Sequence, residues 1–283
     1  MLSESSKLEK ENQFHQLHHN NELLVLPNIW NPLGAMLLEE TGYKAIATAS
    51  ASVAYANGYQ DGEKIPFDEL ILILQNIVKS VKIPVTADVE SGYTQSNSVL
   101  KENIKKLVDT GIAGINFEDS HHEELKLFTK EEQSEKINLI RKTASEKGSY
   151  LFINARTDVF LKQNHLSKEE KLAEAIERGN AYRDAGADGF YPIFLKEKEN
   201  IKTVIEEVQL PVNILMLPGI PDFNELKKIG VARISLGPGF LKFAVNSMKN
   251  IAEKLLRYEG MEEITGNPLT TDYLKNLISK NKK

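Results

Sequence analysis

Cysteine is absent from all 283 residues of the chain. Its absence excludes disulfides, thiolate metal sites and any cysteine nucleophile or acid, and it fits a reducing cytoplasm. Long apolar runs are missing too: no segment has the length of a membrane helix, and residues 1–21 lack the apolar centre of a signal peptide. A positive charge excess is also missing, because the net charge is -5. We therefore expect a cytoplasmic protein that binds neither nucleic acid nor membranes.

What the chain does have is a regular alternation of short apolar segments and longer amphipathic ones. Strands are expected at residues 23–26, 45–48, 83–87, 114–117, 150–154, 188–191, 211–215 and 232–235. Helices are expected between them, at residues 32–41, 67–80, 98–110, 130–147, 168–185, 198–208 and 222–228. Eight such repeats predict an α/β fold in which residues 1–283 form a single (β/α)8 TIM barrel domain. The alternative, an open doubly wound sheet, usually carries a glycine-rich turn after its first strand, and residues 27–30 (PNIW) are not one.

The two ends of the chain lie outside this alternation. Residues 1–21 are expected to be a polar N-terminal arm or helix, whose histidines form a solvated face rather than a metal site. These histidines are His15, His18 and His19. Residues 240–257 and 271–279 are expected to be C-terminal helices, and the first of them carries an apolar stripe that packs on its own barrel or on a second copy.

The most informative stretch is residues 84–93 (PVTADVESGY), a short apolar strand that ends in acid. Asp88 and Glu90 lie two residues apart, so in an extended chain their side chains point to the same side. Gly92 allows a sharp turn after them. Two hard oxygen ligands that converge in this way suit Mg²⁺ or Mn²⁺, which bind few protein carboxylates and keep several waters. The alternative is a solvated acidic loop.

Polar residues also follow the neighbouring predicted strands, where a barrel of this type has its active-site rim. Glu118 and Asp119 end the fourth strand, beside Asp88 on the third, and Arg156 ends the fifth. Acids that bind a cation beside a guanidinium suit an anionic, chelating substrate, with Arg156 holding a carboxylate in bidentate geometry. Alternatively, Arg156 makes only a structural ion pair with Asp158 or Glu118.

Five motifs occur along the chain in a specific order. They are residues 86–93 (TADVESGY), 114–120 (GINFEDS), 153–158 (INARTD), 186–189 (GADG) and 230–238 (GVARISLGP). Their order and spacing resemble the phosphoenolpyruvate mutase/isocitrate lyase superfamily, over a span from about residue 24 to residue 238. The resemblance implies a Mg²⁺-dependent, lyase-like enzyme that makes or breaks a C–C bond in a small 2-oxo or 2-hydroxy carboxylic acid through an enolate. It also implies a homo-oligomer, a tetramer or dimer, built by the terminal helices.

The resemblance also implies roles for single residues. Asp88 matches the acid nearest the metal, and Glu90 and Glu118 match acids that hold it, often through water. Arg156 matches the arginine that binds the substrate anion. The remaining matches are Asp61 near metal and substrate, Ser50 and Ser52 in a cradle for the substrate's carboxyl end, and Asn213 as a substrate-binding asparagine. Asp61 also reads as an ordinary turn residue before Gly62.

The chain departs from the family pattern at two places. It lacks the cysteine loop of isocitrate and methylisocitrate lyases after the fourth strand, and Ile193 stands where relatives carry Glu or His. His121 or His122 is a candidate for the missing loop acid, because histidine titrates near neutral pH. The alternative is that both are ordinary exposed loop residues. These departures leave two other functions open: a phosphonate-type mutase or C–P hydrolase, and a barrel that binds a metabolite without catalysis.

Overall fold

The computed structural model describes residues 4–122, 124 and 126–280 of the chain. Its barrel strands are β1 (Leu24–Leu26), β2 (Asn28–Ile29), β3 (Ile46–Thr48), β4 (Val85–Asp88), β5 (Gly114–Glu118), β8 (Phe152–Thr157), β9 (Gly189–Pro192), β10 (Asn213–Leu215) and β11 (Arg233–Ser235). Parallel pairing gives the orders β2-β3-β4-β5-β8-β9 and β1-β11-β10. A bridge between Phe190 and Val212 joins β9 to β10, and only Pro27 separates β1 from β2, so the ring closes. The predicted (β/α)8 barrel is confirmed, and the alternative of an open sheet is wrong.

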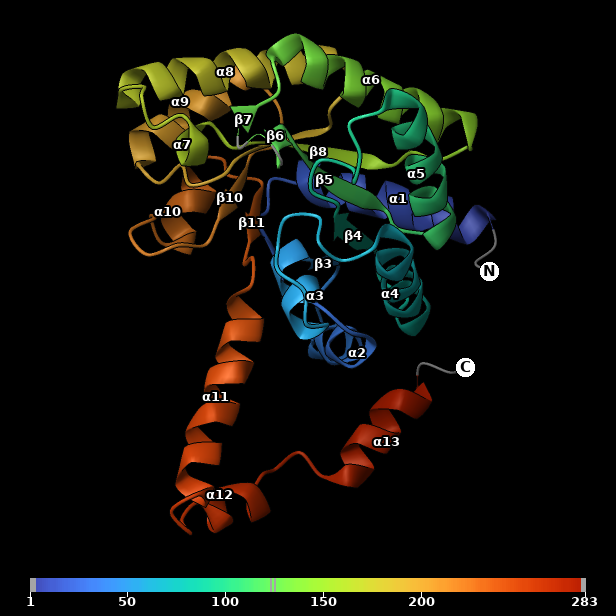
Figure 1. Ribbon diagram of the computed structural model, residues 1–283, viewed down its shortest axis with the longest axis vertical. Coiled ribbons are helices and arrows are strands. Elements are labelled where there is room, and N and C mark those ends of the chain that lie inside the picture. The colour runs from blue at the N-terminus through green and yellow to red at the C-terminus, as the bar shows by residue number, and fades with distance from the viewer. Residues whose placement is uncertain (1–3, 123, 125, 281–283) are drawn as a thin grey trace.

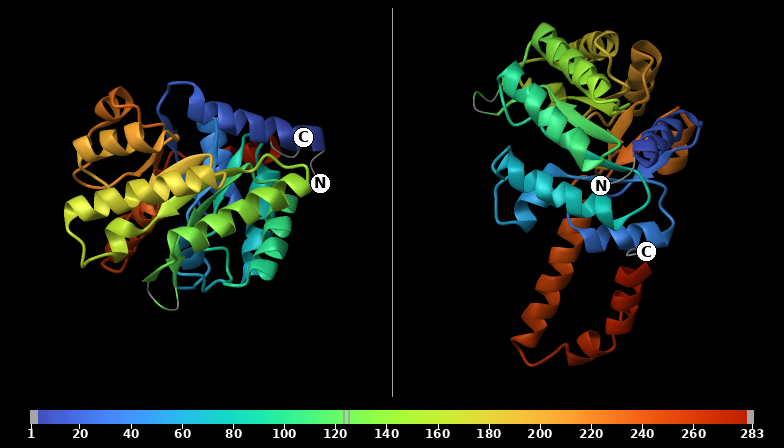
Figure 2. Two further views of the ribbon diagram at one scale, coloured as in Figure 1. Left: turned by 90° about the horizontal axis from the view of Figure 1, so that it is seen from above. Right: turned by 90° about the vertical axis from the view of Figure 1, so that its right-hand side faces the viewer.

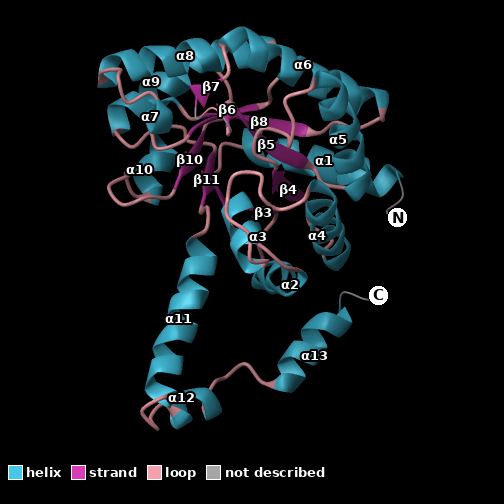
Figure 3. Ribbon diagram, viewed as in Figure 1, coloured by secondary structure: helices cyan, strands magenta, loops and turns pink. Residues whose placement is uncertain are grey.

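Helices surround this ring and continue beyond it (Figures 1 and 3). They are α1 (Glu4–His19), α2 (Pro32–Thr41), α3 (Ser50–Ala56), α4 (Phe67–Ser80), α5 (Asn97–Thr110), α6 (Lys130–Glu146), α7 (Val159–Lys162), α8 (Lys168–Asp184), α9 (Lys198–Val208), α10 (Phe223–Lys228), α11 (Gly239–Leu255), α12 (Met261–Thr265) and α13 (Thr271–Lys280). A small hairpin of β6 (Ser120–His121) and β7 (Lys126–Leu127) follows β5. No helix in the described part of the chain is long and apolar enough to span a membrane.

Local sequence signals explain where several helices begin. Thr129 and Ser167 start α6 and α8 with capping boxes, because each hydroxyl accepts a hydrogen bond from the backbone N–H three residues later. Asn31 caps α2 in the same way through the N–H of Gly34. Every helix that the sequence predicted between strands is therefore present close to its predicted ends.

The N-terminal helix α1 closes one end of the barrel. Phe14 is fully buried against Phe152, and a Cβ on Gly114 would lie 2.9 Å from the Phe14 ring. His15 stacks on Tyr150 and His18 stacks on Phe152, so the expected solvated histidine face is wrong for these two residues. The sequence misled because α1 is polar by composition, and its burial depends on residues more than a hundred positions away. Figure 2 (left) shows α1 on the side of the barrel opposite the β6–β7 hairpin.

The C-terminal helices lie largely outside the barrel. Helix α11 leads away from the strands, and α13 returns toward α2, where Tyr273 and Lys280 both bind Glu40 (Figure 1). Leu241 is the buried residue of α11, whereas Phe243 is 75% exposed and Met248 is 63% exposed. The stripe on α11 thus does not pack on its own barrel beyond its first turn.

Candidate active site

The carboxyl ends of β4, β5 and β8 bring three charged side chains together. Asp88 pairs in register with Asn116, and Glu118 pairs with Arg156. Because register partners in a parallel sheet point to the same side, Asp88, Glu118 and Arg156 all face the inside of the barrel mouth. The structure therefore assembles the acids and the guanidinium that the sequence placed at the strand ends.

Asp88 is partly buried and weakly bound by the protein. One carboxylate oxygen accepts from the N–H and the hydroxyl of Ser50 at 3.3 Å each, and the other accepts from the Glu90 N–H at 3.4 Å. Desolvation raises the pKa of Asp88, Arg156 opposes this rise, and the nearby charge of Asp61 adds to it. Long hydrogen bonds and a raised pKa leave this carboxylate with capacity for a further ligand.

Hydrogen bonds in both directions join Glu63 to the segment that contains Glu90, and we call this set of bonds the Glu63 clasp. Glu90 has a left-handed backbone (φ 51°), and its Oε1 accepts from the Glu63 N–H at 2.9 Å. In return, Oε1 of Glu63 accepts from the N–H and the hydroxyl of Ser91, at 3.1 and 2.7 Å, and from the Tyr93 N–H at 2.8 Å. The clasp ties the α3–α4 loop, which carries Asp61, to the segment after β4. Sequence reasoning missed Glu63, since its partners lie 27 to 30 residues away.

His122 lies between two of the acids. Its Nε2 is 3.4 Å from Glu90 and 3.2 Å from Glu118. Desolvation and then the charges of Glu118 and Asp61 raise the pKa of Glu90 to about 9. Burial alone would lower the pKa of His122, but the hydrogen bond with Glu118 raises it. Among the two loop histidines, the structure thus brings His122 to the acids.

Arg156 is engaged by two carboxylates. Its Nη1 lies 2.7 Å from Glu118, while Nε and Nη2 meet the two oxygens of Asp158 at 2.6 and 3.0 Å. Burial alone would lower the pKa of Arg156, but Asp158, Glu118 and Asp88 raise it well above its usual value. Both ion pairs that the sequence offered as structural alternatives therefore exist. They use three of the five guanidinium N–H groups and leave two for a ligand.

A second network of buried hydrogen bonds is centred on Asp119 and holds the backbone of Asp158, the partner of Arg156. Asp119 accepts from the Thr157 hydroxyl and the Tyr182 hydroxyl, both at 2.7 Å, and pairs with Arg178 at 3.1 Å. It also accepts from the backbone N–H of Asp158 at 2.9 Å. Asp119 is thus a fully buried scaffold acid rather than a further group at the mouth.

The other predicted site residues are distributed unevenly. Ser50 contacts Asp88, and Asp61 is exposed on the loop beside it. Ser52 is fully buried, and its hydroxyl has no hydrogen-bond partner in the described part of the chain. Asn213 is also fully buried, where it bonds Ser235 inside the barrel. His121 is buried too, and it contacts Gln95 and Glu124 instead of the acids. The structure thus does not bring Ser52, Asn213 or His121 to the acids.

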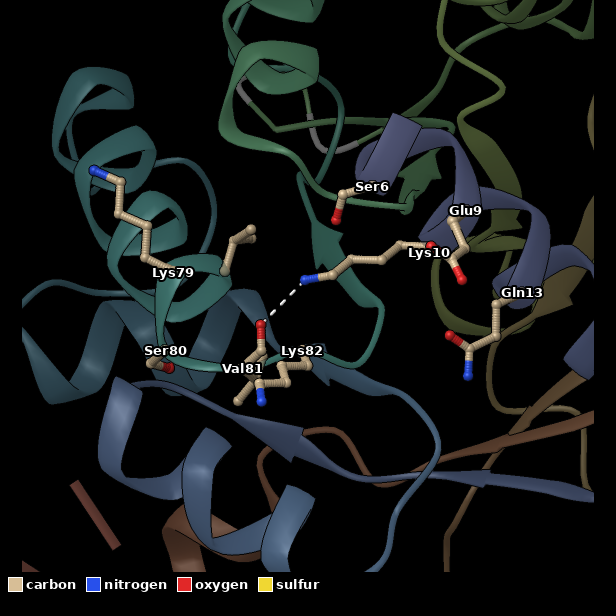
Figure 4. Close-up of a pocket in the computed structure, with 9 residues that line it drawn as sticks. Ser6, Glu9, Lys10, Gln13, Lys79, Ser80, Val81 and Lys82 are labelled. Carbon is tan, nitrogen blue, oxygen red and sulfur yellow. Dashed lines mark hydrogen bonds between the residues drawn. The ribbon is translucent and has the colours of Figure 1, made fainter. Parts of the chain in front are cut away.

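A cavity of about 430 Å³ lies far from these acids, at the closed end of the barrel. Figure 4 shows Lys10 of α1 reaching across it toward the turn after α4, where its Nζ donates to the Val81 carbonyl at 3.1 Å. This contact ties α1 to the barrel and caps the end of α4. We therefore assign the cavity a structural role.

The acids at the mouth fit a hard divalent cation in chemistry but not as a closed cage. In the described part of the chain, no three His, Asp or Glu side chains converge closely enough to hold a metal by themselves. All the acids offer oxygen, and desolvation raises the pKa of each, so a bound cation would stabilise the charged carboxylates that burial disfavours. Mg²⁺ commonly binds one or two carboxylates and keeps several waters. The residues therefore fit a cation bound directly by Asp88 and supported by Glu90 and Glu118 through water.

Comparison with known proteins agrees with the motifs and the fold. The chain is 31% identical to an uncharacterized protein of Mycobacterium tuberculosis (strain H37Rv), over 79% of this chain and 81% of that protein. It is 25% identical to the 2-methylisocitrate lyase of Halalkalibacterium halodurans, over 93% of this chain and 87% of that protein. The crystal structure of a phosphonomutase candidate from Burkholderia cenocepacia J2315 superposes with a TM-score of 0.83 at 36% identity, over 87% of this chain and 99% of that one.

The relatives with a named activity are lyases and phosphomutases, so an enzyme of this superfamily is confirmed. The phosphoenolpyruvate phosphomutase family profile matches residues 14–256, which include every strand of the barrel. The chain belongs to the phosphoenolpyruvate phosphomutase family.

Proposed function

We propose that the chain is a divalent-metal-dependent enzyme that cleaves or forms a C–C bond in a small 2-oxo or 2-hydroxy carboxylic acid through an enolate. The observation that carries this proposal is the joint placement of Asp88, Glu118 and Arg156 on the inner face of the mouth. Acids and a guanidinium this close together suit a substrate that presents both chelating oxygens and a negative charge.

In this proposal, Asp88 holds the cation, with Glu90 and Glu118 behind it. When bound, Mg²⁺ or Mn²⁺ supplies Lewis-acid stabilisation of negative charge on a substrate oxygen. Arg156 orients the carboxylate with its two remaining N–H groups, because Glu118 and Asp158 fix the plane of the guanidinium. Asp61 lies over the site on its loop, and the Glu63 clasp holds that loop down. Ser50 positions the Asp88 carboxylate.

In this proposal, the loop histidine that acts at the site is His122 rather than His121. It contacts Glu90 and Glu118 from the β6–β7 hairpin, while His121 faces away. His122 positions the two acids, because its Nε2 is shared between Glu90 and Glu118. The cysteine of related lyases has no equivalent in this chain.

A phosphonate-type mutase or C–P hydrolase is the second candidate. The similarity to the phosphonomutase candidate of B. cenocepacia favours it. The charged mouth suits a phosphonate as well as a carboxylate, since Arg156 binds either anion.

A substrate panel tests these functions. Purified protein would be assayed on 2-hydroxy acids and on phosphonates, with Mg²⁺, with Mn²⁺ and with EDTA. Metal-dependent release of a 2-oxo acid from a 2-hydroxy acid supports the lyase. Release of inorganic phosphate from a phosphonate supports the C–P hydrolase, and isomerisation of a phosphonate to a phosphate ester without release of phosphate supports the mutase. If oxalate, a planar enolate mimic, binds with Mg²⁺ but no substrate turns over, the chain is a metabolite-binding barrel.

We further propose that the exposed face of α11 builds a homo-oligomer. Its apolar side chains Val245, Met248 and Leu255 are 47%, 63% and 46% exposed, although α11 is long and amphipathic. A contiguous apolar face of this kind usually marks a protein interface. Light scattering at micromolar concentration should give a dimer or tetramer mass, and Met248→Glu should shift it toward the monomer. A monomer mass for the unaltered chain rejects the proposal.

A further inference from the structure

The inner face of the barrel mouth has two unlike halves. The charged half consists of Asp88, Glu118 and Arg156, described above. Arg156 is in turn the register partner of Tyr191 on β9, so Tyr191 faces the inside at the same level. Burial raises the pKa of Tyr191, the adjacent charge of Arg156 opposes this rise, and the charge of Asp88 adds to it. Tyr191 is therefore where the charged half ends.

The other half is apolar. Tyr191, Ile193 and Leu215 pack together in a small cluster that is separate from the main hydrophobic core, with Leu217 at its edge. They are 4%, 7% and 9% exposed. Ile193 lies in the turn after β9, and Leu215 ends β10. We call Tyr191, Ile193 and Leu215 the apolar half.

In the described part of the chain, the carboxyl ends of β9 and β10 carry no basic residue that could pair with a second anionic group. The first basic residues after β9, β10 and β11 along the sequence are Lys196, Lys227 and Lys242. Arg233 does lie inside the barrel, at the start of β11, where it bonds Ser235 and Asn116. Its Nη1 has no hydrogen-bond partner among the described residues, but the side chain is fully buried and does not reach the surface of the mouth. A carboxylate placed against the apolar half would thus lose its hydration without gaining a partner, which is costly.

We propose that the site takes an amphipathic acid, whose 2-oxo or 2-hydroxy carboxylate head binds the charged half and whose alkyl tail packs on the apolar half. A second carboxylate at the end of the tail is disfavoured. The inference rests on the proposed function, because that function assigns the head to the charged half. It narrows the substrate class from small acids in general to those with an aliphatic tail.

Three ligands with one head and different tails test this. Pyruvate has the head alone, 4-methyl-2-oxopentanoate adds a branched alkyl tail, and 2-oxoglutarate adds a tail that ends in carboxylate. Dissociation constants would be measured by calorimetry on the full chain with Mg²⁺. Each buried methylene favours binding by roughly fourfold. We expect 4-methyl-2-oxopentanoate to bind at least about tenfold more tightly than pyruvate, and 2-oxoglutarate to bind no more tightly than pyruvate.

Two variants and a control place the tail. Leu215→Asn and Ile193→Thr should each shrink the preference for 4-methyl-2-oxopentanoate over pyruvate. Leu38→Asn is the matched control: Leu38 is 7% exposed but lies on α2 in the main core, so its preference should equal that of the unaltered chain. The preference is the ratio of the two dissociation constants measured on the same sample, so it does not change if part of the sample is unfolded.

The outcomes separate the two proposals. Tighter binding of 2-oxoglutarate than of 4-methyl-2-oxopentanoate overturns the apolar tail and leaves the proposed function standing. A preference that survives in both Leu215→Asn and Ile193→Thr overturns the assignment to the apolar half. If neither oxalate nor any of the three acids binds with Mg²⁺, the proposed function fails and this inference fails with it.

Discussion

The two ends of the barrel bury ionisable groups of opposite kinds, acids at the mouth and bases toward the closed end. At the mouth, Asp88, Glu90 and Glu118 are acids whose pKa values are raised by desolvation. Toward the closed end, His18 and Arg233 are bases whose pKa values are lowered by the same cause, to about 3 and about 10. At both ends, desolvation disfavours the charged form.

The difference lies in what covers each end. Helix α1 covers the closed end with Phe14 and the stacked His15 and His18, so no ligand can reach the charges there. Loops line the mouth, and Asp88 remains partly exposed with long hydrogen bonds. A buried charge thus indicates a functional site when it keeps unused bonding capacity toward solvent, and a structural one when the fold seals it.

The largest expected effect is a loss of stability caused by a substitution at the closed end. Phe14→Ala removes a fully buried ring from the contact with Phe152, and it should lower the free energy of unfolding by about 3–5 kcal/mol. Urea titration measures this loss. Phe243→Ala, on the exposed face of α11, should change stability by less than about 0.5 kcal/mol. The Mn²⁺ affinity of folded Phe14→Ala protein should be unchanged, and a parallel loss would show that the two ends are not independent.

The next largest expected effect is a loss of metal affinity caused by a substitution at the mouth. Asp88→Asn keeps the shape of the side chain but removes the charge proposed to hold the cation. Mn²⁺ affinity measured by calorimetry should fall at least 100-fold, which corresponds to about 3 kcal/mol. Stability in EDTA should not fall, because a desolvated acid has been removed. Asp68→Asn is a control, since Asp68 pairs with Lys106 at the surface. Equal metal affinity in Asp88→Asn and the unaltered chain rejects the site.

A smaller effect separates ligand binding from scaffolding at Arg156. Arg156→Lys keeps the charge but loses the planar fork, so oxalate should bind more weakly by roughly 1–3 kcal/mol in the presence of Mg²⁺. Arg178→Lys is the matched control, because Arg178 is a buried partner of Asp119 away from the mouth. It should lower the melting temperature and leave oxalate binding intact. If Arg156→Lys behaves in the same way, Arg156 is a structural residue only.

The sequence was sufficient to predict the barrel and the placement of Asp88, Glu118 and Arg156 together at one end of it. Apolar segments of strand length and their flanking glycines set the order of elements, and the register of parallel strands then carries Asp88, Glu118 and Arg156 to one level. These are local signals, because each residue ends a strand that its own neighbours define. They did not require knowledge of any contact distant in sequence.

The misplaced residues depend on distant contacts instead. The sequence left both His121 and His122 as candidates, because nothing local fixes which of two adjacent hairpin residues faces the acids. The structure brings His122 to them. Asn213 starts β10 and lies two residues before its end, at a fully buried level. Glu63 acts through contacts with Glu90, Ser91 and Tyr93, all distant in sequence. Composition and spacing carry no signal for such pairings.

The smallest expected effect is that of a change in pH, which tests both ends of the barrel within one molecule. His18 has a folded pKa of about 3, against an ordinary value of 6.5 in the unfolded chain. Between these values the unfolded state binds more protons, so His18 contributes stability that is lost as pH falls below about 6.5, by up to about 1.4 kcal/mol per pH unit. Its charged and titratable neighbours are Arg233, His15 and His19, and their charges act in the same direction.

Glu90 acts with the opposite sign. Its folded pKa is about 9 and its ordinary value is 4.5, so in this interval the folded state binds more protons and stability falls as pH rises. Urea titrations in EDTA between pH 5 and pH 6.5 would separate the two contributions. His18→Phe keeps a ring on Phe152 but removes the titration, and it should reduce the loss of stability on acidification. Glu90→Gln should increase that loss, while His165→Asn, an exposed control, should leave it unchanged. If His18→Phe and Glu90→Gln shift the slope in the same direction, desolvation does not act on the two ends as the structure indicates.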